Sequence, residues 1–463
     1  MKKHTSLFSI FCFLLTIFYS FNSNAQDSLN TKLLYHWNDT SLHDLTSHLS
    51  IYNEIFGFVQ DGREYGVIGS TLGAHIFDVT DAEDIHPVIT IPAATQGSSV
   101  VNRDYDFFNG YLYMVGDQAG ARLQIADVSF LPDSAPIVYD SDSLFSRAHT
   151  ITVDAPTARL YANGGSHEMN IYDISDPAQP LLLLNCTTLP VWSSIQYVHD
   201  SYAKNDTVYC HAAQRGLFVM DFTDIGNPLL LGSVTQYPQQ GYNHSGWLHK
   251  DGIVYAQADE THGFDVKLFD VSDLSDITLI DTIGSGISEE FSVPHNVVFR
   301  DDFLYVSYYH DGLYIFNVSD PQNIYISGFY DTCVLPDTNN YRGNWGVYPL
   351  LPSGKILASD MQNGFYVFDV SDALSAGISD NTEEKNAVVF PNPFRESFNI
   401  SIPDGTKNNY TFEIMDITGR LVQSGNINHT ITRVNTGKEI TTGNYFLRVI
   451  GNGKSFTRKL VKQ

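Results

Sequence analysis

The chain has 463 residues, of which 43% are hydrophobic and 17% charged, and its formal net charge is −26. The charge is unevenly divided, because residues 26–387 hold 14 basic against 47 acidic side chains, whereas residues 388–463 hold 10 against 5. An acidic body repels phosphate backbones, so the composition disfavours nucleic-acid binding, and the change of sign near residue 388 predicts a domain boundary.

Residues 1–25 have the pattern of a secretory signal peptide. Lys2 and Lys3 precede an apolar run from Leu7 to Tyr19, and small residues lead to Ala25. The run is shorter than the roughly 20 residues that a membrane helix needs, and no second run follows. We therefore expect a secreted chain with no transmembrane segment after cleavage.

Seven copies of one sequence motif follow, and in each a predicted hydrophobic strand leads into Asp-Val-Ser-Asp or a close variant. The copies lie 46 to 52 residues apart, at His75–Asp81, Leu123–Ser129, Asn170–Asp176, Leu217–Asp224, Lys267–Asp273, Leu313–Asp320 and Phe365–Asp372. A repeat of roughly 40–50 residues with several short strands is typical of a β-propeller, one blade per repeat. We interpret the repeated aspartates as turn formers, because Asp side chains accept hydrogen bonds from the backbone one or two residues ahead.

The last copy of the motif is followed by Ala373-Leu-Ser-Ala-Gly377, which makes a poor fourth strand. Lys32-Leu-Leu-Tyr-His-Trp37, near the mature N-terminus, matches the fourth-strand pattern of Pro180–Leu184. We therefore predict that the N-terminal strand pairs with the final blade and closes the ring, which would remove two exposed sheet edges.

Three cysteines remain after cleavage, Cys186, Cys210 and Cys333, and an odd number leaves at least one unpaired. We expect them to be small buried hydrophobic side chains. A Cys186–Cys210 bridge between consecutive blades is the alternative.

The expected fold is all-β, a seven-bladed β-propeller followed by a small C-terminal β-sandwich. The expected organisation is a signal peptide over 1–25, the propeller over 32–373, a polar linker over 374–387 and the sandwich over 388–463.

We expect the candidate ligand-binding or metal-binding residues at the face of the disc where each first strand begins and each second strand ends. First-strand starts contribute Asp104, His149, His244 and His295 to this face, and Asp259 and Glu260 follow a second strand. Imidazoles and carboxylates are suitable ligands for a divalent cation, so we predict that the three histidines converge near the axis, with Asp259 and Glu260 at the rim. The opposing interpretation is that histidines at strand starts bond carbonyl groups or pack on aromatic rings.

The blades resemble the choice-of-anchor B family of extracellular bacterial propellers, which is related to LVIVD-type repeats. The resemblance covers about residues 32–372 and rests on Ala148-His-Thr-Ile-Thr-Val-Asp154, His244-Ser-Gly-Trp-Leu248, Pro294-His-Asn-Val-Val298 and Gly343-Asn-Trp-Gly-Val-Tyr-Pro349. A departure is expected at Trp192-Ser-Ser-Ile-Gln196, where a Thr-His-Asp-like strand start should stand. The resemblance implies no defined activity.

The tail resembles the type IX secretion system C-terminal sorting domain. The matching residues are Pro391, Asn392 and Pro393, then Gly419 and Arg420, then Gly443 and Tyr445. This resemblance implies a partner, the secretion machinery, and export to the surface of a Bacteroidetes-type cell or into the medium.

Two functions remain open at this point. The first is a binding protein whose polar face takes an unidentified extracellular glycan, peptide or protein. The second is a metal-dependent hydrolase or lyase with a site in the propeller funnel, where a divalent metal would be the cofactor. The sequence holds no Gly-rich phosphate loop, His-Glu-x-x-His helix or Gly-x-Ser-x-Gly elbow, so the common nucleotide and hydrolase motifs are absent.

Overall fold

The structure is a computed structural model that describes residues 28–462, except 43–48, 287–289, 322, 334, 336–337, 376–387, 403–409, 417–418, 438–439 and 452–453. The predicted signal peptide and nearly all of the predicted linker lie outside the described residues.

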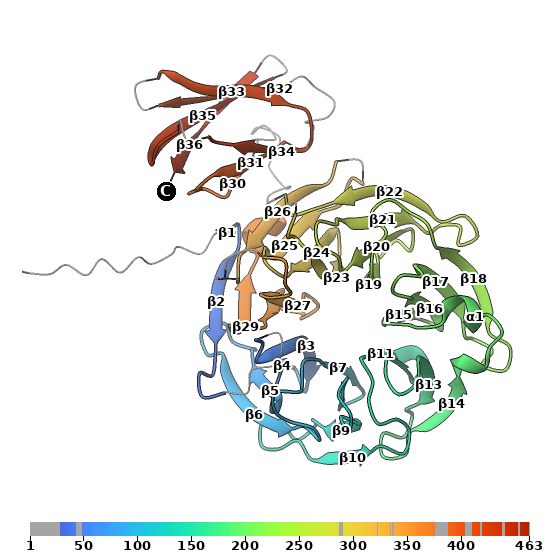
Figure 1. Cartoon of the computed structure of the whole chain (residues 1–463). Helices are drawn as coiled ribbons and strands as arrows, with labels where there is room; N and C mark the ends of the chain where they lie inside the picture. Colours follow the sequence, from blue (N-terminus) through green and yellow to red (C-terminus); the bar gives the residue numbers. More distant parts are fainter. Residues whose placement is uncertain are drawn as a thin grey trace, which may run out of the picture.

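Seven antiparallel sheets, each built mainly from strands that follow one another in the chain, stand around a central channel (Figure 1). The first strand of each sheet is innermost, and the strand after the repeated motif lies at the rim. The predicted all-β fold, a seven-bladed propeller followed by a small sandwich, is confirmed.

The strands of the first three blades alternate with short turns. Blade 1 holds β3 (Tyr52–Gln60), β4 (Arg63–Ser70), β5 (Gly73–Asp78) and β6 (His86–Pro92). Blade 2 holds β7 (Arg103–Phe108), β8 (Tyr111–Gly116), β9 (Leu123–Asp127) and β10 (Ile137–Ser141). Blade 3 holds β11 (Thr150–Asp154), β12 (Arg159–Asn163), β13 (Met169–Asp173) and β14 (Leu181–Asn185).

The next three blades repeat this order. Blade 4 holds β15 (Asp200–Lys204), β16 (Thr207–His211), β17 (Leu217–Asp221) and β18 (Leu229–Val234). Blade 5 holds β19 (Asn243–Leu248), β20 (Val254–Asp259), β21 (Val266–Asp270) and β22 (Thr278–Ile283). Blade 6 holds β23 (Pro294–Arg300), β24 (Phe303–Tyr308), β25 (Gly312–Asn317) and β26 (Tyr325–Tyr330), with the two-residue strand β1 (Ser28–Leu29) at its outer edge.

Blade 7 is closed by the N-terminal segment. Its own strands are β27 (Asn344–Tyr348), β28 (Ile356–Asp360) and β29 (Gly364–Asp369), and its outer strand is β2 (Lys32–Trp37). Lys32 lies opposite Asp369 and Trp37 opposite Phe365. The prediction of closure by this strand is confirmed, and helix α2 (Ser371–Ser375) follows the last repeat in place of a fourth strand.

The repeated aspartates form turns, as the sequence predicts. The carboxylate of Asp173 accepts the backbone N–H of Ser175 at 2.8 Å, and Asp270 accepts that of Ser272 at 2.9 Å. Equivalent hydrogen bonds from a backbone N–H two residues ahead are accepted by the side chains of Asp78, Asp127, Asp221, Asn317 and Asp369. These hydrogen bonds lower the pKa of Asp173 and Asp270, so the motif stabilises the turn between the third and fourth strands.

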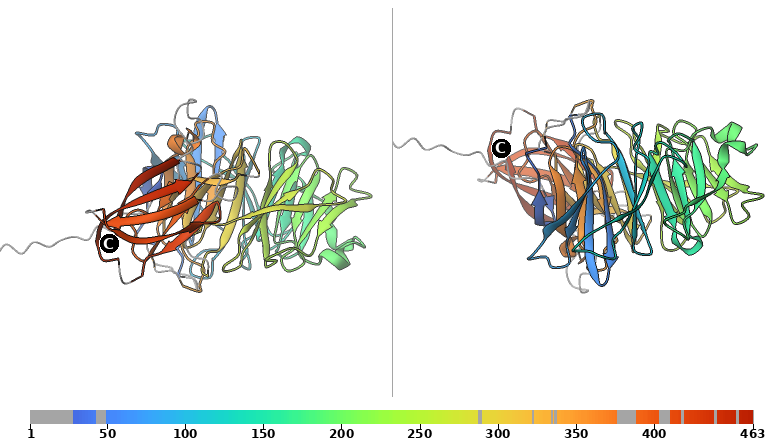
Figure 2. Two further views of the ribbon diagram at one scale, coloured as in Figure 1. Left: turned by 90° about the horizontal axis from the view of Figure 1, so that it is seen from above. Right: turned by 90° about the horizontal axis from the view of Figure 1, so that it is seen from below.

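The C-terminal part forms two facing sheets. One holds β30 (Val388–Phe390), β31 (Ser397–Ser401) and β34 (Ile431–Asn435), and the other holds β32 (Tyr410–Asp416), β33 (Leu421–Ile427), β35 (Gly443–Gly451) and β36 (Lys454–Lys462). The sandwich lies beside blade 6, as Figures 1 and 2 show, and the ring of Phe390 lies 5.5 Å from that of Phe329.

The three described cysteines are free and buried, which supports the prediction that they are small core side chains. No helix among the described residues is long and apolar enough to cross a membrane.

Candidate functional site

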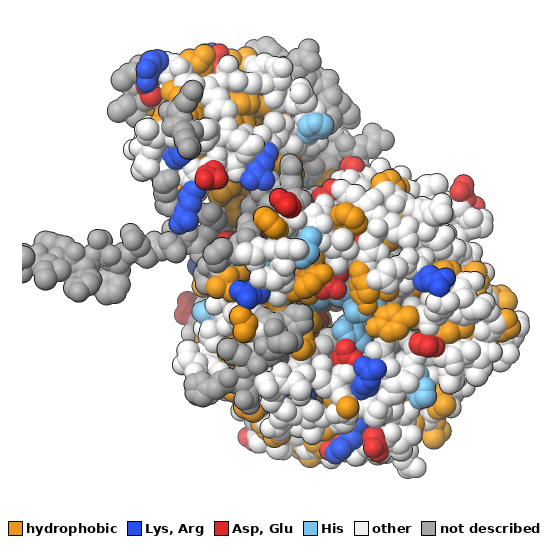
Figure 3. Space-filling model, in the orientation of Figure 1, with side chains coloured by type: hydrophobic (Ala, Val, Ile, Leu, Met, Phe, Trp, Pro, Cys, Tyr) orange, Lys and Arg blue, Asp and Glu red, His pale blue; other side chains and the backbone are white. Residues whose placement is uncertain are grey.

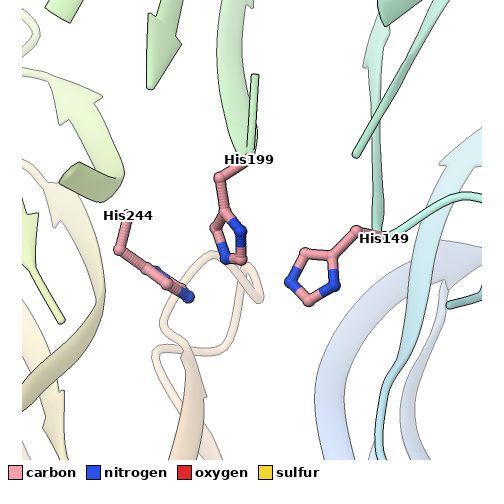
Figure 4. Close-up of side chains that lie close together, drawn as sticks. All are labelled: His149, His199 and His244. Atoms are coloured by element: carbon pink, nitrogen blue, oxygen red, sulfur yellow. The ribbon is translucent and has the colours of Figure 1, made fainter. Parts of the chain in front are cut away.

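Five aromatic rings from five successive blades line one level of the channel. They follow one another as His149, His199, His244, His295 and Trp345, with neighbouring ring centroids 4.1, 4.5, 4.1 and 4.6 Å apart. Figure 4 shows the first three rings turned towards a shared space. We call the four imidazoles the histidine arc.

Local backbone irregularities help to place these rings. The pairing register shifts between Asn243 and Ser245, which makes His244 an extra residue in its strand, and a similar shift occurs at Trp345. A bulge re-aims a side chain, here at positions next to the axis. Gly164, at φ +62°, passes so close to the arc that an added Cβ would lie 2.8 Å from the Cβ of His149.

Hydrogen bonds orient the end rings of the arc. His295 donates from Nδ1 to the Trp345 carbonyl at 2.5 Å, and His149 donates from Nδ1 to Asp117 at 3.0 Å. Asp117 is itself held by Arg147 at 2.9 Å. A neutral imidazole that donates from Nδ1 carries its lone pair on Nε2, which is the arrangement that metal-binding histidines use.

The two central rings have unsatisfied nitrogens. Within the described part of the chain, Nε2 of His199 and Nδ1 of His244 have no hydrogen-bond partner, although the two residues are only 5% and 4% exposed. Two sets of three side chains, His149 with His199 and His244, and His244 with Glu260 and His295, each bring three potential ligand atoms within 4.8 Å of one another.

Burial disfavours the charged form of His199, His244 and His295. It lowers the pKa of His295 to about 3, and burial with repulsion from neighbouring imidazoles lowers the pKa of His199 and His244 well below the usual range. Neutral imidazoles are the form that binds metal ions, so little proton competition is expected at neutral pH.

A cavity of about 750 Å³, which we call the outer pocket, opens beside the arc on the predicted functional face. Its wall includes Gln240, Tyr242, Glu260, Tyr309 and Trp345. Tyr309 donates to Glu260 at 2.7 Å, and burial raises the pKa of Glu260 to about 7. Figure 3 shows the hollow at the centre of the disc, with histidine side chains in its wall.

Carboxylates form the next level of the channel. Glu54, Asp104, Asp106 and Asp200 line a second cavity of about 720 Å³, the inner pocket, which also reaches His149, His244 and His295. Burial raises the pKa of Glu54 to about 7 and that of Asp200 to about 6. Burial and the charges of Glu54 and Asp200 raise the pKa of Asp104 well above its usual range.

Most of the predicted site residues line the channel, and Asp259 does not. The structure brings His149, His244, His295 and Glu260 together, and Asp104 lies one level below them in the inner pocket. Asp259 does not line either pocket, because its carboxylate lies in the blade, 2.9 Å from Nζ of the buried Lys267. His211 is also structural, since it bonds Asn243 and Tyr255.

His199 is the functional residue that the sequence analysis missed. The departure expected near Trp192 is wrong, because Trp192–Ile195 forms the short helix α1 and the strand start follows it as Val198-His199-Asp200. The signal was present, since this triplet has the His-polar pattern of His244-Ser245 and His295-Asn296.

The sorting-motif residues hold the sandwich together. Asn392 donates to the carbonyl of Lys459 at 2.7 Å and accepts from the amide of Val461 at 2.8 Å, which ties the loop after β30 to the final strand. Arg420 pairs with Asp416 at 3.0 Å beside Gly419, whose φ of +84° suits glycine. Tyr445, two residues after Gly443, donates to the carbonyl of Thr441.

Comparisons with known proteins identify both parts. Residues 388–463 match the secretion system C-terminal sorting domain, and residues 164–188 and 295–332 match the LVIVD repeat. No curated protein matches the chain.

Among solved structures, the chain is similar to PorZ, an essential bacterial surface component of the type IX secretion system of Porphyromonas gingivalis. The identity is 12% and the TM-score 0.44, over 88% of this chain and 59% of that chain. Saccharomyces cerevisiae Sqt1 is similar at 12% identity and a TM-score of 0.45, over 68% of this chain and 83% of that one. The chain therefore carries LVIVD repeats in its β-propeller and a C-terminal sorting domain, and this domain indicates export by type IX secretion to the cell surface or the extracellular space.

Proposed function

We propose that this exported propeller is a metal-dependent binding protein. In this proposal the histidine arc holds one divalent transition-metal ion, and the outer pocket presents the open position of the ion to an extracellular ligand. The observation that carries the proposal is the set formed by His149, His199 and His244, three ring nitrogens within 4.8 Å of one another on three separate blades.

The donor set selects the kind of metal. Three imidazole ligands favour Zn²⁺ or another first-row transition ion over Ca²⁺ or Mg²⁺, which prefer oxygen ligands. Three protein ligands also leave a fourth position of a tetrahedral ion free. Asp117 supports the arrangement, because a carboxylate that accepts from the far side of an imidazole fixes the ring and raises its basicity.

The outer pocket indicates the kind of ligand. Its described lining holds amide and aromatic side chains such as Gln214, Gln240 and Tyr341, and no lysine or arginine. Amides and aromatic faces are suited to a neutral glycan or a peptide, whereas an anionic ligand would meet Glu260 without a basic group to balance its charge.

Removal of one arc histidine tests the proposal. We expect the mature chain to bind one Zn²⁺ after dialysis, measured by elemental analysis and titration calorimetry, and His199→Ala to lose stoichiometric binding. Asp117→Asn should weaken Zn²⁺ binding by about 10–100-fold, as losses of outer hydrogen-bond partners do. His86→Ala is the matched control, because His86 is half exposed on the outer strand of blade 1. Equal metal content in wild type and His199→Ala would contradict the proposed metal site at the histidine arc.

A second candidate function, metal-dependent hydrolysis, is favoured by Glu260. Its carboxylate lies 3.9 Å from Nε2 of His244, and a pKa of about 7 suits a general base. Glu260→Gln should then keep Zn²⁺ and lose hydrolysis of nitrophenyl ester or glycoside probes. If Zn²⁺-loaded wild type hydrolyses none of these probes above the Glu260→Gln background, binding without hydrolysis is the function to pursue.

The sorting domain should be needed for export and not for folding of the propeller. A chain that ends at residue 380 keeps all seven blades and loses the contacts that Val388, Phe390 and Ile431 make with the propeller. We expect its melting temperature to fall by a few degrees at most and the protein to stay inside the outer membrane, as cell fractionation would show. Surface display of this shortened chain would contradict the role of the tail.

A further inference from the structure

The inner pocket has a chemical character different from that of the histidine arc. At one end stand the carboxylates of Glu54, Asp104 and Asp200, and beyond them the wall is aromatic, with Phe107, Tyr202 and Trp247. The cavity of about 720 Å³ is large enough for a small organic molecule.

Lys204 also lines the inner pocket, but in the part of the chain that the structure describes it forms no ion pair with the carboxylates there. Among the described residues, none of Glu54, Asp104, Asp106 and Asp200 forms an ion pair, whereas Asp259, Asp117 and Glu64 all do. Their hydrogen bonds come from neutral groups: Trp345 and Asn296 donate to Glu54, and the amide of Ile151 donates to Asp104. The cluster therefore gathers acidic groups at a place where burial makes a negative charge costly, and a bound cation would stabilise their ionised form.

A further buried acceptor faces the same cavity. Asn102 lines the inner pocket at 5% exposure, and its Oδ1 has no hydrogen-bond partner within the described part of the chain. Such an atom lowers stability unless a donor reaches it, and an ammonium group has three N–H donors.

The spacing of the carboxylate oxygens favours an organic cation over a metal ion as the ligand of this pocket. In the described chain, three potential ligand atoms lie within 4.8 Å of one another in the two histidine-containing sets and not among these four carboxylates. Ca²⁺ needs six to eight oxygens at about 2.3–2.6 Å, which such spread carboxylates do not supply. The aromatic wall is equally unsuited to a bare metal ion, whereas ammonium groups are attracted to aromatic faces.

We propose that the inner pocket binds an organic ammonium ion, with its charged group among Glu54, Asp104 and Asp200 and its apolar body against Trp247 and Tyr202. The ammonium position lies one level below the proposed metal position, and the two share the wall formed by His149, His244 and His295.

Titration calorimetry with three probes of one size tests the proposal on the full mature chain in the presence of EDTA, so that the result is independent of bound metal. We expect 2-phenylethylammonium to bind at one per chain, and neutral 2-phenylethanol and anionic phenylacetate to bind at least about tenfold more weakly, since hydrogen bonds to charged groups are the stronger ones. Equal binding of the three probes, or no binding of the ammonium, overturns the proposal.

Variants locate the site. Asp104→Asn removes the charge and keeps an oxygen that can accept from Ile151, and Trp247→Leu removes the aromatic face and keeps every charge. Each should weaken 2-phenylethylammonium binding by about tenfold, while Asp301→Asn, an exposed turn residue outside the channel, should leave it unchanged. Unchanged binding in both pocket variants, with native circular dichroism, overturns the location. The comparison of probes on the wild type needs no variant and decides the question even where a variant fails to fold.

Discussion

Deleting Lys32–Trp37 should lower the melting temperature of the mature protein by about 10 °C or more. The segment supplies the outer strand of blade 7, and Leu34, Tyr35 and Trp37 pack on the cluster that contains Phe77 and Phe365. Each large side chain withdrawn from water contributes about 1.5–3 kcal/mol, and the deletion also leaves β29 as an exposed edge.

The matched control for this deletion is loss of Ser28–Leu29 alone. Strand β1 adds two residues to the outside of a sheet that already has four strands, so its removal should shift the thermal transition only slightly. Scanning calorimetry or circular dichroism measures both. A ring that melts at the wild-type temperature without Lys32–Trp37 would show that closure by this strand contributes little.

Asp259→Asn should be among the most destabilising single substitutions in the propeller. Asp259 and Lys267 are both 0% exposed, and the substitution leaves the Lys267 ammonium between the rings of Tyr237 and Phe264 without its counter-ion. Breaking one side of a buried pair costs about 3–5 kcal/mol. Denaturant titration should show this loss, and Lys267→Met in the same chain should restore part of it because no unpaired charge remains.

The pH dependence of that variant provides a second readout. Burial lowers the pKa of Lys267 below its usual value even in the wild type, and loss of Asp259 lowers it further. The unfolded chain therefore binds more protons than the folded one, so the stability of Asp259→Asn should rise with pH between neutrality and about 10. Asp301→Asn, at the exposed turn, should show no such rise.

The repeat made the architecture predictable, and it made part of the site predictable too. The seven repeats mark the third strand of each blade, and blade geometry then predicts that His149, His244 and His295 lie on one face. His199 escaped because helix α1 lengthens the connection ahead of its strand, which moved the expected strand start by several residues.

Other features depend on distances that the sequence does not contain. Asp259 and Glu260 are neighbours in the chain, yet the alternation of a strand sends one side chain into the blade against Lys267 and the other towards the channel. The repulsion among Glu54, Asp104 and Asp200 arises only when blades 1, 2 and 4 face one another across the axis.

Ring closure by the N-terminal strand also sets an order of events during synthesis. Lys32, made early, finds its partner only when Asp369 has been made, so the last sheet joins the two ends of the propeller across nearly its whole length. Contacts so distant in sequence form slowly and late. The sorting domain follows β29 in the chain. A chain interrupted before blade 7 is complete therefore lacks both the strand that pairs with Lys32–Trp37 and the signal for export. Synthesis through Asp369 is required for a closed ring, and synthesis of the sorting domain beyond it is required for the export address.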